Sequence, residues 1–175
     1  GIMVFESDWL RHNIAKIRPD PHKGELLLTD TVKLALAQGK DVECLQLDNS
    51  SEGIGCDSQQ DLAKAERLLR NKKLDELMAH GVSIEDPNRT YIDLDVAIGS
   101  DTRILAGCHI LGKTIIGEQC HIGPNAQITD SKISDRCTVK HASILTSTEI
   151  ADGSSVGPFA HLRDGTILDK KVDIG

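Results

Sequence analysis

The stretch "IIGEQCHIGPNAQI", residues 115–128, repeats isoleucine at every sixth position, at Ile116, Ile122 and Ile128. Six residues turn an α-helix through about 600°, so these side chains would scatter over three faces of a helix. In extended chain, side chains alternate between two faces, and an even spacing places all three on the same side. The stretch is therefore predicted to be extended, with one aliphatic face.

The same spacing runs from residue 92 to the end of the chain and shortens to five residues twice. An odd step inside a strand would reverse the strand's faces, so we expect the missing residue to be dropped from a turn. The predicted inward aliphatic residues are Ile92, Ile98, Ile104, Ile110, Ile116, Ile122, Ile128, Ile133, Val139, Ile144, Ile150, Val156, Leu162, Leu168 and Ile174. Two positions earlier, the same parity places small residues inward: Thr102, Cys108, Cys120, Ala126, Cys137, Ser154, Ala160 and Thr166.

One continuous strand of this length is excluded, because strands seldom exceed about 10 residues. The chain must turn at every hexad and stack its aliphatic ladders as a β-helix, in which three hexads complete one coil. A β-sandwich would instead show turns about every 8–12 residues. Cys120 and Cys137 are 17 residues apart, so we expect them to stack as inward packing residues.

Composition narrows the class of protein. The 175 residues allow one or two domains, and the formal net charge of −7 lacks the basic footprint of a nucleic-acid-binding protein. No apolar run approaches the roughly 18 residues of a membrane span, and no signal peptide opens the sequence. Five cysteines, an odd number at irregular spacing, favour a reducing compartment. We therefore expect a cytoplasmic protein without membrane or nucleic-acid partners.

The first ninety residues alternate short apolar runs with helical patterns. Residues 2–5 and 42–47 are predicted strands, and helices are predicted from Ser7 to Pro19, over residues 28–39, and from Ser58 to His80. This alternation favours an α/β fold, but two or three strands are too few for a complete sheet. The chain also begins at Gly1 and ends on an uncapped hexad, whereas solenoids need capping ends, so we expect a piece of a longer protein.

Three stretches together resemble the bacterial bifunctional N-acetylglucosamine-1-phosphate uridyltransferase and glucosamine-1-phosphate acetyltransferase. They are "GELLLTD" (24–30), "EGIGCDSQQDLAKAE" (52–66), and the junction "GVSIEDPNRTYIDLDVAIG" (81–99) followed by "VGPFAHLRDG" (156–165). The resemblance implies that residues 1–81 are the end of a Rossmann-like nucleotidyltransferase domain with a linking helix. Residues 82–175 are then an incomplete left-handed β-helix of hexapeptide repeats, although crossover connections are right-handed in about 98% of cases.

The resemblance implies a homotrimeric enzyme of UDP-N-acetylglucosamine biosynthesis. One domain transfers uridylyl from UTP to N-acetylglucosamine-1-phosphate with Mg²⁺, and the other transfers acetyl from acetyl-coenzyme A to glucosamine-1-phosphate. The family's nucleotide loop would precede Gly1 and its catalytic histidine would follow Gly175. No catalytic residue is therefore assigned within the chain, and the chain alone is predicted to be inactive.

Two residues match the family's binding positions. Asp57 lies where the family ligates Mg²⁺, an ion that prefers hard oxygen ligands, and a helix start behind it favours phosphate. Arg163 matches the arginine that holds the sugar phosphate, a role suited to a bidentate guanidinium. On sequence alone, the preferred interpretation is that Asp57 is a helix-capping or turn aspartate and that Arg163 is a solvated surface residue.

Departures from the family pattern leave two alternative functions open. Asp57 stands where asparagine is usual, and Asp164 replaces a proline. The alternatives are another sugar-1-phosphate nucleotidyltransferase whose β-helix is structural, and a non-catalytic β-helix assembly module. A zinc site is disfavoured, because the pairs Cys108-His109 and Cys120-His121 are twelve residues apart and fall on different faces of the prism.

Overall fold

The computed structural model describes residues 2–175 and divides the chain into two compact units, Gly1–Gly55 and Cys56–Gly175. The division places the long helix that follows Ser58 in the same unit as the coils, whereas the sequence predicts a boundary after Gly81.

The N-terminal unit is built from short helices. It contains α1 (Ser7–Asn13), the 3₁₀ turn η1 (Ile14–Lys16), α2 (Asp30–Ala37) and the 3₁₀ turn η2 (Ser50–Gly53). Helices α1 and α2 are joined through Gln38, which accepts from the Trp9 indole N–H and donates to the buried Asn13, both at 2.8 Å.

The strands predicted at residues 2–5 and 42–47 are wrong, since no strand forms among residues 2–55. A strand is stabilised by hydrogen bonds to neighbouring strands, and an isolated pair is marginal in water. These two segments find no partner within the unit, and their side chains are largely exposed, as at Val4 and Leu45. The unit therefore has no sheet.

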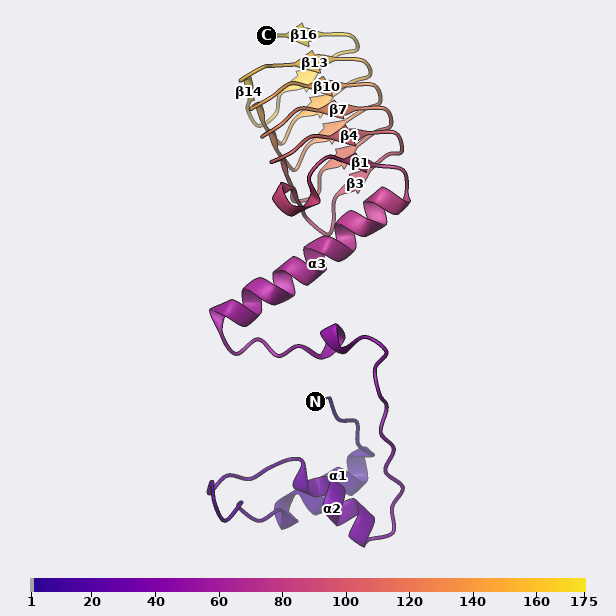
Figure 1. Ribbon diagram of the computed structural model, residues 1–175, viewed down its shortest axis with the longest axis vertical. Helices are drawn as coiled ribbons and strands as arrows, with labels where there is room; N and C mark the ends of the chain where they lie inside the picture. Colours follow the sequence, from indigo (N-terminus) through magenta and orange to yellow (C-terminus); the bar gives the residue numbers. More distant parts are fainter. Residues whose placement is uncertain (1) are drawn as a thin grey trace. The chain divides into compact units, whose positions relative to one another are not determined.

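The second unit begins with α3 (Gln59–Ala79), a helix of 21 residues. Ser58 caps it as predicted, because its hydroxyl accepts from the backbone N–H of Asp61 at 3.2 Å. Only the C-terminal half is packed: Leu74 and Leu77 are buried in the same core as Ile92, while Leu62 and Leu69 are about half exposed. The C-terminal half of α3 thus covers the apolar end of the first coil (Figure 1).

The rest of the unit is a parallel β-helix, visible as stacked coils in Figure 1. Every third strand pairs in parallel, which gives three sheets. Sheet A contains β1 (Ser83–Ile84), β4 (Arg103–Ile104), β7 (His121–Ile122), β10 (Thr138–Val139), β13 (Ser155–Val156) and β16 (Asp173–Ile174); sheet B contains β2 (Tyr91–Ile92), β5 (His109–Leu111), β8 (Gln127–Thr129), β11 (Ile144–Thr146) and β14 (His161–Leu162); sheet C contains β3 (Ala97–Ile98), β6 (Ile115–Ile116), β9 (Lys132–Ile133), β12 (Glu149–Ile150) and β15 (Ile167–Leu168). The 3₁₀ turn η3 (Pro87–Arg89) precedes β2.

The predicted inward ladder is confirmed at every aliphatic position except one. Twelve of these side chains are buried and Ile98 and Ile174 are partly buried against them, but Ile144 is 39% exposed and Leu145 takes its place at 0%. The second five-residue step therefore runs from Leu145 to Ile150, and not from Val139 to Ile144. Both short steps fall in the turns that lead from sheet B to sheet C, so the residue is dropped from a turn, as predicted.

The glycines behind the aliphatic ladder are explained by the close stacking of the coils. A Cβ added at Gly117 would lie 2.8 Å from the backbone nitrogen of Asp135, and one at Gly123 would lie 2.7 Å from that of His141. Neither glycine has a positive φ, so glycine is required here because the next coil's backbone leaves no room for a side chain.

Candidate functional site

Asp57 lies in the loop that enters α3, one residue before the Ser58 cap, and its side chain is exposed. Its acidic neighbour Asp61 is engaged locally: its carboxylate accepts from the Ser58 hydroxyl at 2.5 Å and from Lys64 Nζ at 3.2 Å. The Ser58 hydrogen bond, with help from Lys64, lowers the pKa of Asp61. Asp57 forms no salt bridge with another described residue, so its carboxylate is open to a ligand.

Asp57 can supply only one of the ligands that a Mg²⁺ ion needs. Among residues 2–175, no three His, Cys, Asp or Glu side chains lie close enough to hold a metal ion together. Mg²⁺ commonly uses one or two carboxylates and completes its octahedron with water and substrate phosphates. Asp57 provides one such carboxylate, and the N-terminal N–H groups of α3 beside it favour a phosphate.

Arg163 follows the buried Leu162 of β14 and is exposed, as the strand parity predicts. Its backbone carbonyl accepts from the Thr166 N–H at 3.1 Å and from the Thr166 hydroxyl at 2.6 Å. These two bonds hold the turn, while the guanidinium forms no salt bridge with the residues that the structure describes. Its five N–H donors are therefore available to an anion.

Exposed ring side chains occur at the turn before β14 and in β14 itself. Phe159 is 72% exposed and meets His141 edge to face, with ring centroids 4.7 Å apart. His161 points outward from β14, two residues before Arg163. His161 and Arg163 thus lie on the outward side of the same segment, where the guanidinium can bind an anionic ligand.

Asp57 and Arg163 do not form one site. α3 has 21 residues and is thus about 30 Å long, and Asp57 lies at the end that is not packed on the coils. Arg163 follows β14, which is four coils beyond β2 in sheet B, at about 4.8 Å per coil. In Figure 1, α3 runs obliquely away from the lower end of the coils, and β14 lies near their upper end, so the unit separates the two predicted ligand-binding residues.

The histidines are distributed as predicted. His109 lies in β5 of sheet B and His121 in β7 of sheet A, so the two Cys-His pairs face different sides of the prism. The contact that His109 makes was not predicted. Its ring stacks on that of Tyr91, with the ring centroids 4.7 Å apart. The Arg70 guanidinium lies 4.4 Å from the Tyr91 ring centre. The spacing of Tyr91 and His109 by one coil is the signal that could have predicted the stack.

The stack of Arg70, Tyr91 and His109 fixes α3 to the coils. The hollow beside it, lined by Glu66, Arg70, Tyr91 and Asp93 among others, has a volume of about 180 Å³. Ligand sites usually enclose about 300–1,000 Å³, so this contact is best explained as structural.

Comparisons with known proteins extend over the whole chain. It is 40% identical over 175 residues to the bifunctional protein GlmU of Pelobacter propionicus, and 37% identical over 175 residues to that of Exiguobacterium sibiricum. These matches confirm the resemblance drawn from the three motifs. The chain spans about two fifths of the length of these relatives, 38% and 39% respectively.

Two further matches cover part of the chain. The family model described as the GMPPB C-terminal domain matches residues 92–175. A crystal structure of a perosamine N-acetyltransferase mutant from Caulobacter crescentus, in complex with CoA and GDP-perosamine, aligns over 59% of this chain and 60% of its own. The identity is 15% and the TM-score 0.39. Within residues 2–175, no helix has both the length and the apolar character that spanning a bilayer requires.

Proposed function

We propose that this chain is an internal segment of a bifunctional enzyme of UDP-N-acetylglucosamine biosynthesis. The enzyme transfers uridylyl from UTP to N-acetylglucosamine-1-phosphate and acetyl from acetyl-coenzyme A to glucosamine-1-phosphate. The observation that carries the proposal is the similarity of all 175 residues, at 40% identity, to a protein named bifunctional protein GlmU. The wide separation of Asp57 from Arg163 supports it, because two different reactions need two sites.

The proposal assigns a part of the enzyme to each segment. Residues 1–81 are the end of the nucleotidyltransferase domain with its linking helix, and residues 82–175 are the first coils of a left-handed β-helix. The enzyme is cytoplasmic, and its partners are sugar phosphates and nucleotide, with no membrane or nucleic acid. The odd number of irregularly spaced cysteines supports a reducing compartment, and the negative charge supports the absence of a nucleic-acid partner.

Asp57 contributes to uridylyl transfer as a metal ligand. When bound, Mg²⁺ neutralises the charge on the phosphates and aligns them for in-line attack. Asp57 supplies one hard carboxylate oxygen, held at the N-terminus of α3 by the Ser58 cap. The backbone N–H groups of that first turn present partial positive charge to a phosphate oxygen.

Arg163 contributes to acetyl transfer as the binding group for the sugar phosphate. Two parallel N–H donors of its guanidinium bind two oxygens of the phosphate of glucosamine-1-phosphate. This anchors the substrate on the outer surface of the coils while its amine points to the acetyl donor. The base that accepts the amine's proton lies outside the chain, since none of the seven histidines matches the catalytic motif.

The intact enzyme is a homotrimer of parallel prisms. Ile115 and Ile167 project outward from sheet C and are 50% and 72% exposed. Large aliphatic side chains on a flat sheet face are stabilised when a neighbouring prism covers them. Their position supports subunit contacts through this face.

In the full-length enzyme, Arg163→Ala is expected to raise the KM for glucosamine-1-phosphate in acetyl transfer by roughly 10- to 100-fold. A hydrogen bond to a charged group contributes about 1.5–3 kcal/mol, and about 1.4 kcal/mol is a factor of ten. Steady-state kinetics with varied glucosamine-1-phosphate measure the change. Arg103→Ala, which removes an exposed arginine from sheet A, is the matched control and leaves the KM unchanged. An unchanged KM for Arg163→Ala rejects the assignment.

A second candidate function is a sugar-1-phosphate nucleotidyltransferase whose β-helix has only a structural role. This second function is supported by the match of residues 92–175 to a family model with a different name, the GMPPB C-terminal domain. The two functions differ in one measurable activity, because only the bifunctional enzyme turns over acetyl-coenzyme A with glucosamine-1-phosphate.

A further inference from the structure

One corner of the prism carries a column of buried polar side chains. At the turn from sheet C to sheet A, Thr102, Cys120, Cys137 and Ser154 lie one above the other, each at most 2% exposed. Each hydroxyl or thiol reaches a backbone carbonyl of the next coil. The distances are 2.8 Å from Thr102 to Gly117, 3.1 Å from Cys120 to Ser134, 3.3 Å from Cys137 to Ala151 and 2.7 Å from Ser154 to Asp169. Two thiols thus occupy the centre of a hydroxyl column.

The backbone places Cys120 and Cys137 at equivalent positions on two consecutive coils, one directly above the other. β7 and β10 pair with His121 opposite Thr138, and the His121 N–H donates to the carbonyl of Cys137 at 2.9 Å. Neighbouring strands lie about 4.7–4.9 Å apart, so the Cα atoms of Cys120 and Cys137 are separated by about that distance. A disulfide needs a Cα separation of about 4.4–6.8 Å. The backbone therefore requires no large movement for a disulfide to form.

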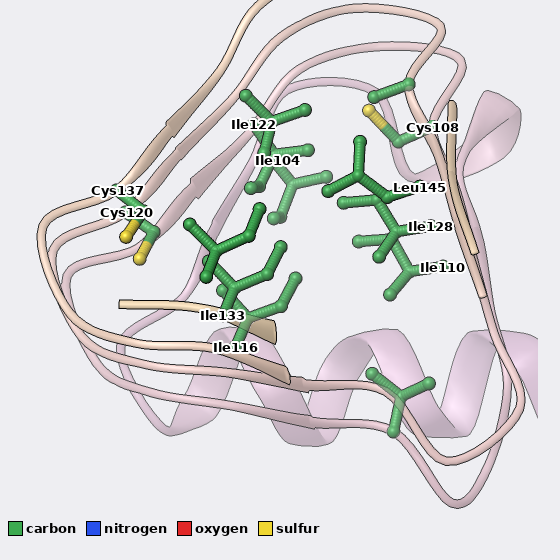
Figure 2. Close-up of a cluster of buried hydrophobic side chains, with 14 of the residues drawn as sticks. Ile104, Cys108, Ile110, Ile116, Cys120, Ile122, Ile128, Ile133, Cys137 and Leu145 are labelled. Atoms are coloured by element: carbon green, nitrogen blue, oxygen red, sulfur yellow. The ribbon is translucent and has the colours of Figure 1, made fainter. Parts of the chain in front are cut away.

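The side chains also face each other. Figure 2 shows the sulfur atoms of Cys120 and Cys137 side by side at one corner, while Cys108 lies at another corner of the prism. The two thiols are close enough for each to shift the pKa of the other. The other two cysteines, Cys44 and Cys56, are exposed and lie outside the coils.

We propose that Cys120 and Cys137 are an oxidation site, at which a peroxide converts the two stacked thiols into a reversible disulfide that joins two consecutive coils. This inference stands on the geometry of the coils and is independent of the proposed function.

The reaction is balanced by one peroxide. The Cys137 thiolate attacks a peroxide oxygen: an S–O bond forms, the O–O bond breaks, and the hydroxide that leaves takes up the proton lost by Cys137. The Cys120 sulfur then attacks the sulfenic sulfur of Cys137, so that an S–S bond forms and the S–O bond breaks. The Cys120 proton leaves with the departing oxygen as water. Two thiols and hydrogen peroxide thus give one disulfide and two waters.

The surroundings of the pair support Cys137 as the attacking sulfur. The neighbouring Cys120 thiol, helped by the backbone N–H groups of Ser154 and Gly153, lowers the pKa of Cys137, whereas the neighbouring Cys137 raises the pKa of Cys120. Burial raises the pKa of Cys108 to about 11. The thiolate is the reactive form, so Cys137 reacts before Cys108.

The test uses the 175-residue chain with Cys44→Ser and Cys56→Ser, which leaves three thiols. The folded protein is treated with hydrogen peroxide, alkylated, digested and examined by mass spectrometry. The expected result is one cross-linked peptide pair, Cys120 with Cys137, with Cys108 still alkylated, and complete reversal by dithiothreitol. The cross-linked protein is also expected to have a higher midpoint in urea, because the disulfide restricts the unfolded chain.

Three controls make the outcome decisive. Oxidation in urea should scramble the pairing among the three remaining cysteines, so selective pairing must come from the fold. Cys137→Ser and Cys120→Ser should each abolish the cross-link, and each serine can still donate to the carbonyl that the thiol reached. When the protein refolds in the presence of peroxide, the thiols are accessible before they become buried, so burial cannot prevent their oxidation. Three free thiols after both native and refolding oxidation, sulfinic acids without a cross-link, or a lower urea midpoint would overturn the proposal.

Discussion

Leu145→Ala is expected to lower the free energy of unfolding of the second unit by about 2–5 kcal/mol, the range for truncating a buried leucine. Leu145 is 0% exposed and lies in the inward ladder of sheet B, between Ile128 and Leu162 of the neighbouring coils. Close stacking fixes those neighbours, so they cannot move in to fill the cavity that the truncation leaves. Urea denaturation followed by circular dichroism measures the loss.

The residue beside it provides the matched control. Ile144 is in the same strand, one position away, but points outward and is 39% exposed. Ile144→Ala removes a side chain of the same size and is expected to cost less than about 1 kcal/mol, because surface substitutions have small effects. A larger loss for Ile144→Ala than for Leu145→Ala would restore the register predicted from the sequence and contradict the structure.

Asp57→Ala in the full-length enzyme is expected to lower kcat/KM for uridylyl transfer roughly 100-fold or more, and to leave acetyl transfer within a few-fold. Stabilisation of phosphate charge by a metal is worth several kcal/mol, and about 1.4 kcal/mol is a factor of ten. Both rates are measured on the same preparation at saturating Mg²⁺. Asp57→Asn should retain more activity than Asp57→Ala, because the amide keeps an oxygen ligand.

The control for Asp57 lies one helical turn away. Asp61 is acidic and near the same helix end, but its carboxylate is occupied by Ser58 and Lys64. Asp61→Asn is expected to leave uridylyl transfer within a few-fold. Parallel loss of both reactions in Asp57→Ala would indicate a folding defect and remove the metal assignment.

The β-helix could be predicted from the sequence because its backbone geometry requires an inward aliphatic residue at about every sixth position. An aliphatic residue every six positions has one structural solution when three parallel sheets share a core. The register error at Ile144 has a local cause: Leu145 is the next residue and equally apolar, so hydrophobicity does not decide which of the two points inward. The pattern of small residues does not decide it either, because Ala142 stands two positions before Ile144 just as Ser143 stands two positions before Leu145.

The fold of the first 55 residues could not be predicted in the same way. Apolar runs such as residues 2–5 indicate strand propensity, but a strand forms only where another strand supplies hydrogen bonds. Whether such a partner strand exists cannot be predicted from the apolar run itself. The cap of α3 was predictable, since Ser58 and Asp61 interact within one turn and no distant residue is needed.

The candidate site residues could be predicted from motifs that resemble a known family, and not from the periodicity that predicts the fold. Asp57 and Arg163 were identified by motif, and the structure adds that both are exposed and lie far apart. The stacking of Cys120 on Cys137 followed from their spacing and is confirmed by their common burial and level (Figure 2). Their hydrogen-bonding environment could not be predicted, because it depends on carbonyl groups of the next coil.

A pair of turnover assays on two proteins, the full-length enzyme and the 175-residue chain, tests most directly whether these residues belong to a bifunctional enzyme. One assay supplies UTP, Mg²⁺ and N-acetylglucosamine-1-phosphate, and the other acetyl-coenzyme A and glucosamine-1-phosphate. We expect the full-length protein to turn over both substrate pairs and the 175-residue chain, which has Asp57 and Arg163 but no assigned catalytic base, to turn over neither. Failure of the full-length protein in either assay contradicts the bifunctional assignment. Turnover by the 175-residue chain, removed by a substitution within it, would show that an active site lies inside these residues.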